Sequence, residues 1–550
     1  MTKNNNLEND VKIENLKPIN PVLRYFYVII SMFRTNIRDY GMFIALIVIF
    51  ILFAISTNGV FLRPRNFSNL LDQTAYVAVL AIGMTLVIVT RQIDLSVGFL
   101  SAFLGAYVIV AVQVLGQNLF FAIGVALLIT LIVGIIKGYL IANVKVPSFV
   151  VTLAGMFIFK GFLMIRTDNT TITTTHPFFQ AIGKGYLLRN FTVGGYNILA
   201  LIIGALLIFL MIFTSIMRRR KNRQLGVQNE ETQIYLTKQF LTVLVLAILT
   251  RNLAAFNGIS YLFLITLFVL VIYFIFTTKS TLGRRIYAVG GNPEAAELSG
   301  IKVSTTLIIV FVSMGILALF AGLMYATKVQ NTSPQHGVSW ELYAIAATFI
   351  GGASAGGGVG KVINSVVGAI VIMSIPNGLA LTPGSNANIE PIILGSILLL
   401  AVIFDIYTRN VRPVDLVGMY YAKQVHGEEL SQAREELLTA KAELYDAKVA
   451  IKELDKAKAK LEAMEAALKD AESKGDVEKL QDAKNKFEAA QAELREAENE
   501  TKDIKMIDYE YALTNAQTRI SKIKNIIRIA EEEEFVNDEM DNDPHLQEKI

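Results

Sequence analysis

Long apolar runs are the feature that most constrains the fold of this 550-residue chain. Runs of roughly 17–24 residues match the thickness of a bilayer, and they recur through about three quarters of the sequence. They predict an all-α, polytopic membrane helix bundle of about 10–12 spans. A shorter apolar piece, Leu342–Ile350, is expected to form a half-helix. The predicted spans lie near residues 41–57, 74–90, 96–115, 119–142, 148–165, 196–216, 239–256, 259–277, 304–326, 360–380 and 389–407.

Charge divides the chain into two parts. Residues 421–550 hold 21 Lys and Arg against 32 Asp and Glu, which leaves 30 against 15 for residues 1–420 out of the totals of 51 and 47. The acidic part is rich in Ala, Glu, Lys and Leu, a composition typical of long soluble helices. We predict five segments: an N-terminal segment 1–40, a transmembrane domain 41–408, a linker 409–426, a helical hairpin or coiled coil 427–530, and an acidic disordered tail 531–550.

Basic residues cluster at four places that the positive-inside rule assigns to the cytoplasm. They are the N-terminal tail, the loop 218–223, the segment 283–302, and the exit of the last span at Arg409 and Arg412. Both termini are therefore expected in the cytoplasm, and the segments 167–175 and 328–341 outside. The chain has no Cys, which excludes disulfides and thiolate metal sites.

Apolar residues of the acidic part recur at heptad spacing. Leu437, Leu444 and Ile451 are seven apart, and Ser473–Asp476 is a plausible turn before a second series. The pattern predicts two antiparallel helical arms that bury these stripes against each other. A single solvated helix remains the alternative, because many other heptad positions are Ala, Lys or Glu.

A polar island, residues 283–301, separates the apolar runs Tyr261–Phe276 and Thr306–Tyr325. Asn-Pro-Glu at 292–294 supplies an N-cap, a first-turn proline and an acid that suits the helix dipole. A helix of about two turns should follow and end at a C-terminal glycine. Such a helix between spans could receive force from a soluble motor; an ordinary basic loop is the alternative. The candidate coupling residues are Gly283, Arg284, Arg285, Gly291, Asn292, Pro293, Glu294, Ala295, Ala296 and Gly300.

Asp94 is the one acidic residue that we expect between two long apolar runs. A carboxylate at membrane depth usually pairs with a cation or lines a polar path. One alternative is a pair with Arg91, three residues away. The other is a helix break at 94–98 beside a substrate path, for which the candidate residues are Gln92, Asp94, Ser96 and Asn377.

Other polar and glycine positions carry weaker signals. Lys137 is expected to snorkel to the interface, and Gly134 and Gly138 suit close helix contact. The glycine-rich segment 351–360 lacks the phosphate-loop pattern, because Ala355 and Val362 stand where Gly and Ser/Thr are needed. We expect no metal site, no catalytic residues and no enzyme, and any ATP must be bound by a separate subunit.

Four ordered segments resemble the permeases of ABC importers, in the monosaccharide (ribose/xylose, multiple-sugar) branch. The island resembles their cytoplasmic "EAA" coupling loop. Ser148 stands where the branch has a second proline. The long spacer between Gly161 and Gly258 is most similar to xylose-type permeases, and the resemblance covers roughly residues 40–408. The four segments are Gln92–Gly98, Val144–Leu153, Tyr287–Ile301, and Phe349–Ser354 with Gly356–Gly360 and Asn377–Leu379.

The resemblance implies the permease subunit of an ATP-driven importer for a monosaccharide such as xylose or ribose. It implies a bacterial cell membrane location and alternating access coupled through 283–301. It also implies an ABC ATP-binding subunit that binds ATP and Mg, an extracellular sugar-binding protein or lipoprotein, a permease homodimer, and no nucleic acid. Three alternatives remain: a nucleoside ABC permease; a membrane-anchored scaffold or sensor acting through the coiled-coil tail; and a secondary transporter, which would need more intramembrane carboxylates than Asp94.

Overall fold

The computed structural model describes residues 37–225, 232–408, 416–474 and 477–502, with Asn20, Phe26, Tyr27, Ile30 and short pieces between 504 and 522. The predicted disordered tail 531–550 lies outside the described residues. The chain divides into two compact units. One comprises residues 36–411, and the other comprises residues 1–35 and 412–550.

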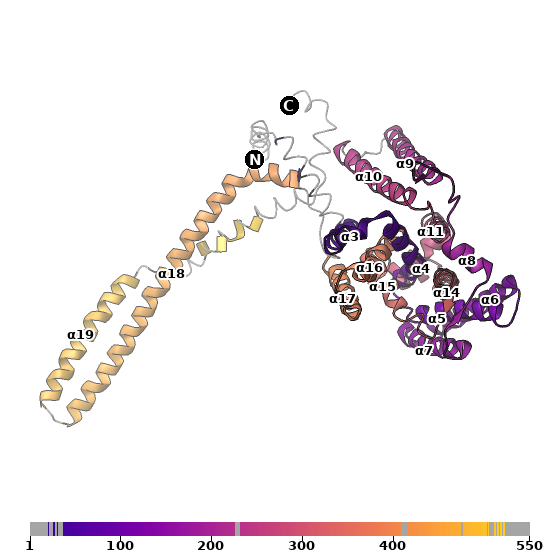
Figure 1. The fold of residues 1–550 in the computed structure, drawn as a ribbon. Coiled ribbons are helices and arrows are strands. Elements are labelled where there is room, and N and C mark those ends of the chain that lie inside the picture. The colour runs from indigo at the N-terminus through magenta and orange to yellow at the C-terminus, as the bar shows by residue number, and fades with distance from the viewer. Residues whose placement is uncertain are drawn as a thin grey trace. The chain divides into compact units, whose positions relative to one another are not determined.

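The unit of residues 36–411 is a helix bundle with two short antiparallel ladders (Figure 1). Its helices are α3 (Ile37–Ser56), α4 (Pro64–Val89), α5 (Val97–Gln113), α6 (Leu119–Ala142), α7 (Ser148–Thr167), α8 (Pro177–Lys184), α9 (Ile198–Gln224), α10 (Thr232–Ala254), α11 (Tyr261–Lys279), α12 (Thr281–Gly291), α13 (Pro293–Leu298), α14 (Val303–Val329), α15 (Trp340–Ile350), α16 (Val362–Leu381) and α17 (Glu390–Thr408), with 3₁₀ turns η1 (Val60–Leu62) and η2 (Ala387–Ile389). Its strands are β1 (Ile172–Thr173), β2 (Thr192–Val193), β3 (Tyr196–Asn197) and β4 (Asn331–Thr332).

Each predicted span coincides with one of these helices, and the predicted half-helix is α15. Within the described residues, 8 helices are long and apolar enough to cross a membrane, and three shorter apolar helices accompany them. The all-α, polytopic fold class is therefore confirmed. Helices α8 and α12 were not predicted, because both are short and amphipathic rather than continuously apolar.

Helix α4 is the most enclosed of the spans. In the most apolar 18-residue stretch of α4, 94% of the residues are buried. The corresponding share is 11–22% for α6, α7, α9, α10 and α11. It packs against α14, α15, α16 and α11, which surround it in Figure 1. Since α4 contacts so many neighbours, it is the element through which distant parts of the bundle can be connected.

The connecting segments differ from the predictions at one point. The basic stretch 218–223 is not a loop but the last turns of α9, where Lys and Arg are good helix formers and complement the negative end of the helix dipole.

Strand β1 pairs with strand β4, and Ile172 lies opposite Thr332. The two segments predicted to lie outside therefore meet on the same side.

Helices α6 and α14 approach closely at two glycines. A Cβ built on Gly134 would lie 2.6 Å from the Val312 Cα, and one on Gly138 would lie 2.6 Å from the Ile308 Cα. Only glycine leaves room for this approach. The predicted close contact at Gly134 and Gly138 is confirmed.

The second unit contains two long helices, α18 (Leu416–Lys474) and α19 (Val477–Thr501). They pack side by side (Figure 1), and α18 begins inside the predicted linker, which has no proline after residue 413 to stop a helix. The Lys460 Nζ lies 2.6 Å from the Glu493 carboxylate, and the Arg519 guanidinium lies 2.7 Å from that of Glu436. The ion-pair partners of α18 lie later in the sequence where the α18 residue lies earlier: Lys460 pairs with Glu493, and Glu436 pairs with Arg519. The two arms therefore run antiparallel.

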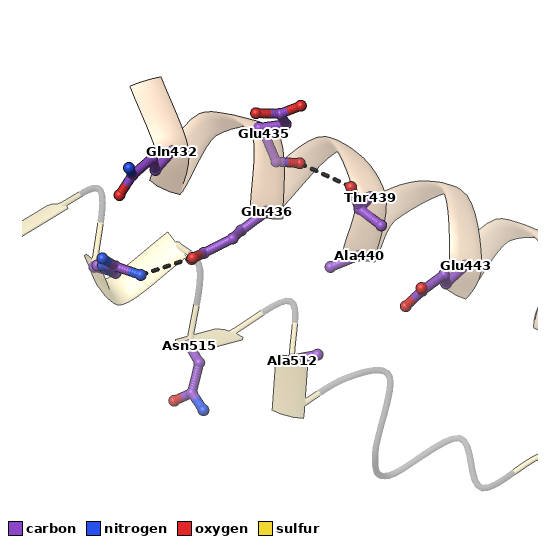
Figure 2. Close-up of a pocket in the computed structure, with 9 residues that line it drawn as sticks. Gln432, Glu435, Glu436, Thr439, Ala440, Glu443, Ala512 and Asn515 are labelled. Carbon is purple, nitrogen blue, oxygen red and sulfur yellow. Dashed lines mark hydrogen bonds and ion pairs between the residues drawn. The ribbon is translucent and has the colours of Figure 1, made fainter. Parts of the chain in front are cut away.

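Small side chains form much of the seam between these arms. The buried positions are Ala433, Ala440, Ala447, Ala457 and Ala490, together with Leu444. A groove of about 750 Å³ runs along α18, and its lining includes Gln432, Glu435, Glu436, Glu443 and Asn515 (Figure 2). Three glutamates and Arg519 line it, and Arg519 pairs with Glu436.

The glycine contact between α6 and α14 generates a prediction for Gly138→Ala. The added methyl group would overlap the α14 backbone, so we expect the unfolding free energy to fall by about 1–3 kcal/mol. The measurement is the unfolding temperature of the full chain in detergent. The matched control is Gly124→Ala on the same helix, where nothing lies within 4 Å. Equal unfolding temperatures for the two variants would contradict the predicted contact.

Candidate functional site

The polar island forms two helices at one end of the bundle. The side chain of Ser280 caps α12 by accepting from the Gly283 N–H at 2.8 Å. The side chain of Asn292 caps α13 by accepting from the Ala295 N–H at 3.0 Å, with Pro293 in the first turn. The helix ends at Leu298, and Gly300 follows with a φ of 80°, a conformation that favours glycine. The predicted cap and stop of the short helix are confirmed.

The surface of α13 is polar apart from one large side chain. Leu298 is 91% exposed, while Glu294, Ala295 and Glu297 beside it are also exposed. On α12, Arg284 and Arg285 are exposed, whereas Gly283 and Ile286 are buried. The island therefore presents a charged surface with one exposed leucine.

Arg91 connects this island to the end of α4. Its Nε donates to the Gly290 carbonyl at 2.8 Å, and its Nη2 donates to the Gly291 carbonyl. These are the last carbonyls of α12, where a cation is favoured by the helix dipole. Because the guanidinium points to α12, the alternative in which Arg91 pairs with Asp94 is wrong.

The glycine-rich segment 351–360 contacts both the end of α4 and the island. The Gly358 N–H donates to the Val89 carbonyl at 2.8 Å, and the Tyr287 hydroxyl donates to the Gly360 carbonyl at 2.7 Å. Burial raises the pKa of the Tyr287 hydroxyl, so it stays a neutral donor. Gly290 must be glycine, because any Cβ there would overlap the Val89 carbonyl. The island, the end of α4 and the segment 351–360 are thus joined by backbone carbonyls.

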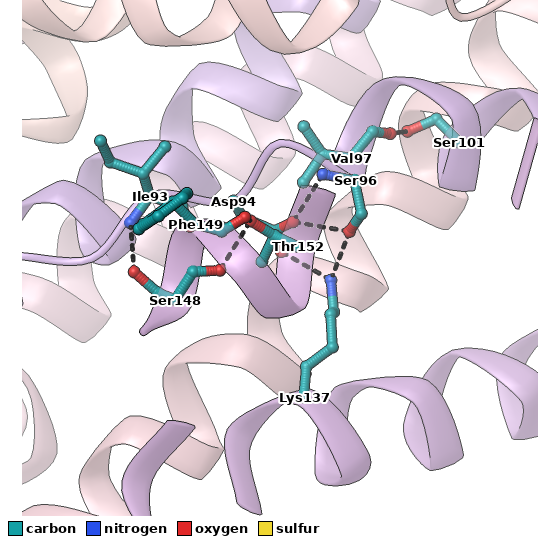
Figure 3. Close-up of polar contacts among 9 residues, drawn as sticks. All are labelled: Ile93, Asp94, Ser96, Val97, Ser101, Lys137, Ser148, Phe149 and Thr152. Atoms are coloured by element: carbon teal, nitrogen blue, oxygen red, sulfur yellow. Dashed lines mark hydrogen bonds and ion pairs between the residues drawn. The ribbon is translucent and has the colours of Figure 1, made fainter. Parts of the chain in front are cut away.

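The loop after α4 is held by a buried ion pair (Figure 3). The Lys137 Nζ lies 2.6 Å from Asp94 Oδ2 and donates to the Ser96 hydroxyl at 3.0 Å. Asp94 Oδ1 accepts from the Ser96 N–H at 3.0 Å and from its hydroxyl at 2.6 Å. Asp94 is 0% exposed and Lys137 4%. The predicted snorkelling of Lys137 is therefore wrong: a carboxylate in reach satisfies the ammonium inside the bundle.

The start of α7 contacts this loop from the other side. The Ser148 hydroxyl accepts from the Ile93 N–H at 3.4 Å, and the Thr152 hydroxyl donates to the Ile93 carbonyl at 3.3 Å (Figure 3). A Cβ on Gly155 would lie 3.1 Å from the Ser96 Cβ. All four ordered sequence segments therefore converge on the loop 90–96, which we name the α4–α5 loop.

The predicted path residues do not form one group. The Gln92 amide donates to the Thr90 carbonyl at 3.3 Å, beside the island. Asp94 and Ser96 are sealed inside the bundle. Asn377 lies at the other end of α4, where its amide exchanges hydrogen bonds with Asn66 at 2.9 and 3.2 Å and donates to Gln73 at 3.2 Å. The structure thus brings Asp94 and Ser96 together and separates them from Asn377.

Sequence reasoning missed an acidic group near Asn377. Helix α4 begins at Pro64, about ten residues before the predicted start, and so includes Asp72. The expectation that Asp94 is the one intramembrane acid is wrong, because Asp72, Glu341 and Asp405 are also buried in helices. Polar residues at 66, 72 and 73 interrupted the apolar run; their helical spacing was the available signal. Within the described residues, no group of three or more His, Asp or Glu side chains could hold a metal ion.

This arrangement defines a multi-pass membrane protein with a short, capped polar helix at one end. Residues 66–403 match the family described as branched-chain amino acid transport system / permease component. The chain is 37% identical over 370 residues to the xylose transport system permease protein XylH of Haemophilus influenzae, covering 67% of this chain and 96% of the relative. The chain therefore belongs to this family of ABC-transporter permeases.

Two further relatives agree. The xylose transport system permease protein XylH of Escherichia coli is 37% identical over 375 residues, 68% of this chain and 93% of the relative. The ribose import permease protein RbsC of Bacillus subtilis is 30% identical over 367 residues, 66% of this chain and 90% of the relative. No solved structure matches the chain.

The buried ion pair generates a prediction for Lys137→Met. Removing the ammonium leaves Asp94 charged and unpaired in the bundle, which costs about 3–5 kcal/mol of stability. We expect a lower unfolding temperature in detergent and less folded protein in the membrane. The double variant Lys137→Met, Asp94→Asn should recover much of the loss, because no buried charge remains. Independent, additive effects of the two substitutions would contradict the pairing.

Proposed function

We propose that this chain is the permease subunit of an ATP-driven importer for a monosaccharide such as xylose or ribose. The observation that carries the proposal is the similarity to permeases named for xylose and ribose over at least nine tenths of their length. The same relatives favour a sugar over a nucleoside. Under this proposal the protein performs transport and no chemical conversion.

We further propose that the permease works with an ABC ATP-binding subunit and an extracellular sugar-binding protein or lipoprotein, and that two permeases form the pathway. ATP and Mg would be bound by the ATP-binding subunit and not by this chain. The basic residues of the island and of the end of α9 support a cytoplasmic position for this side, and so for both termini, in a bacterial cell membrane. The β1–β4 ladder would then lie outside.

The island is the proposed contact with the ATP-binding subunit. An exposed leucine on a short, capped helix can fill a pocket of a partner, and the flanking Glu294 and Glu297 can meet basic groups there. The two helices are bonded to the bundle at Arg91 and Tyr287. A displacement of the island would therefore be transmitted to the end of α4.

Alternating access follows from this connection. Helix α4 contacts α14, α15 and α16 along its length, so a movement of its cytoplasmic end would shift the packing of the helices around it. The α4–α5 loop is held by the Asp94–Lys137 pair and so behaves as a rigid joint rather than a flexible tether. This is the mechanical role that we assign to Asp94, in place of a direct contact with sugar.

The docking proposal predicts the result of Leu298→Asp. A charged side chain in a partner pocket should weaken the complex by about tenfold or more, since a central interface side chain contributes roughly 2 kcal/mol or more. The measurement is co-purification of the ATP-binding subunit with the full chain in mild detergent. The matched control is Leu115→Asp, a leucine 52% exposed in the α5–α6 connection.

Three outcomes are informative. Loss of the ATP-binding subunit with Leu298→Asp and its retention with Leu115→Asp supports the docking role. Retention with both variants contradicts the role of the island. If the wild-type chain brings no ATP-binding subunit while its fold is preserved, the importer proposal itself is overturned, and a scaffold acting through α18 and α19 or a secondary transporter becomes the better explanation.

A further inference from the structure

A cavity lies between α4 and α14 at the end of the bundle away from the island. Its volume is about 320 Å³, near the lower end of the range of roughly 300–1,000 Å³ for small-molecule sites. Gln73 lies sixteen residues before Val89 on α4, or about 24 Å at the helical rise. The lining includes Asp72, Gln73, Tyr76, Tyr325, Lys328 and Met373.

One wall of this cavity is charged but balanced. The Lys328 Nζ lies 3.1 Å from Asp72 Oδ2, and the Ser260 hydroxyl donates to Asp72 Oδ1. Asp72 is buried, while 26% of the Lys328 side chain is exposed. Because the carboxylate and the ammonium cancel, the wall suits neither a free cation nor a free anion. It offers hydrogen-bonding groups to a neutral ligand.

Amide groups extend the polar wall. The Gln73 carbonyl oxygen accepts from the Asn377 amide at 3.2 Å, and Asn377 in turn bonds to Asn66. This series of hydrogen bonds fixes the orientation of the Gln73 amide. Within the part of the chain that the structure describes, the Gln73 amide nitrogen donates to no protein acceptor, so it can donate to a ligand hydroxyl.

Aromatic side chains, Tyr76 on α4 and Tyr325 on α14, form another part of the lining. The Tyr76 and Tyr325 rings lie 5.0 Å apart, and each contacts the Trp340 ring, at 4.7 and 4.4 Å. Trp340 is the single tryptophan of the chain and begins the half-helix α15. Tightly packed rings present rigid, flat apolar faces with polar edges.

We propose that this cavity is a sugar-binding subsite of the transport pathway. A monosaccharide is neutral, carries hydroxyls that both donate and accept, and has C–H faces that stack on aromatic rings. The cavity provides a matching set: balanced charges, an oriented amide and aromatic faces. The inference rests on the proposed function, because it identifies where the imported sugar is held within one permease.

The absence of cysteine makes a direct occupancy test possible. Gln73→Cys places a single thiol in the cavity of the full chain, assembled with its ATP-binding and sugar-binding partners in proteoliposomes. We measure its labelling by a small, membrane-impermeant thiol reagent with and without D-xylose, and then D-ribose. At a sugar concentration about ten times the dissociation constant, labelling should slow about tenfold, since the free fraction falls by that factor. The matched control is Arg65→Cys, an exposed position on the same helix, whose labelling should not change.

A second measurement uses the wild-type chain and one cavity variant. Titration of either sugar into the purified wild-type chain should change the fluorescence of Trp340, and Tyr325→Ala should remove the change. A complex that transports sugar while neither sugar alters labelling at residue 73 or Trp340 fluorescence overturns the subsite alone. A wild-type complex that transports no sugar and shows neither effect overturns the proposed function together with the subsite.

Discussion

The buried ion pair between Asp94 and Lys137 is the interaction on which the rest of this membrane unit depends. A carboxylate and an ammonium inside a helix bundle are tolerated only when each satisfies the other, and here the pair also binds Ser96 at the start of α5. It thereby holds the α4–α5 loop in one conformation. In that conformation Arg91 reaches the last carbonyls of α12, and the start of α7 contacts Ile93.

Helix α4 then places two different kinds of site at its two ends. At one end, backbone carbonyls join it to the island and to the glycine-rich segment, an arrangement suited to transmitting displacement. At the other end, Asp72 and Gln73 line a cavity with aromatic walls, an arrangement suited to holding a small neutral ligand. The most enclosed helix of the bundle is thus also its connection between the proposed motor contact and the proposed substrate contact.

The sequence predicted those features that depend on local signals. Apolar length was sufficient for the spans, and the Asn292 cap with the Gly300 stop was sufficient for the island helix, because both act within one or two turns. The ion pair joins residues 43 positions apart, so no local pattern could identify Lys137 as the partner of Asp94. Asp72 was missed for a related reason. Its partner Lys328 is on another helix, so the sequence around Asp72 showed only a polar residue, which we interpreted as lying before the start of the span.

The most direct test of the central claim, that the α4–α5 loop joins the island to the pathway, is transport by the Arg91→Ala variant. Sugar uptake and ATP hydrolysis should be measured together in the reconstituted complex, with Arg91→Lys as the comparison that keeps the charge but loses the two-pronged contact. We predict that the ATP-binding subunit remains bound while the sugar moved per ATP falls at least about tenfold, since two charge-assisted hydrogen bonds are lost. Wild-type uptake at wild-type ATP consumption in Arg91→Ala would contradict the claim.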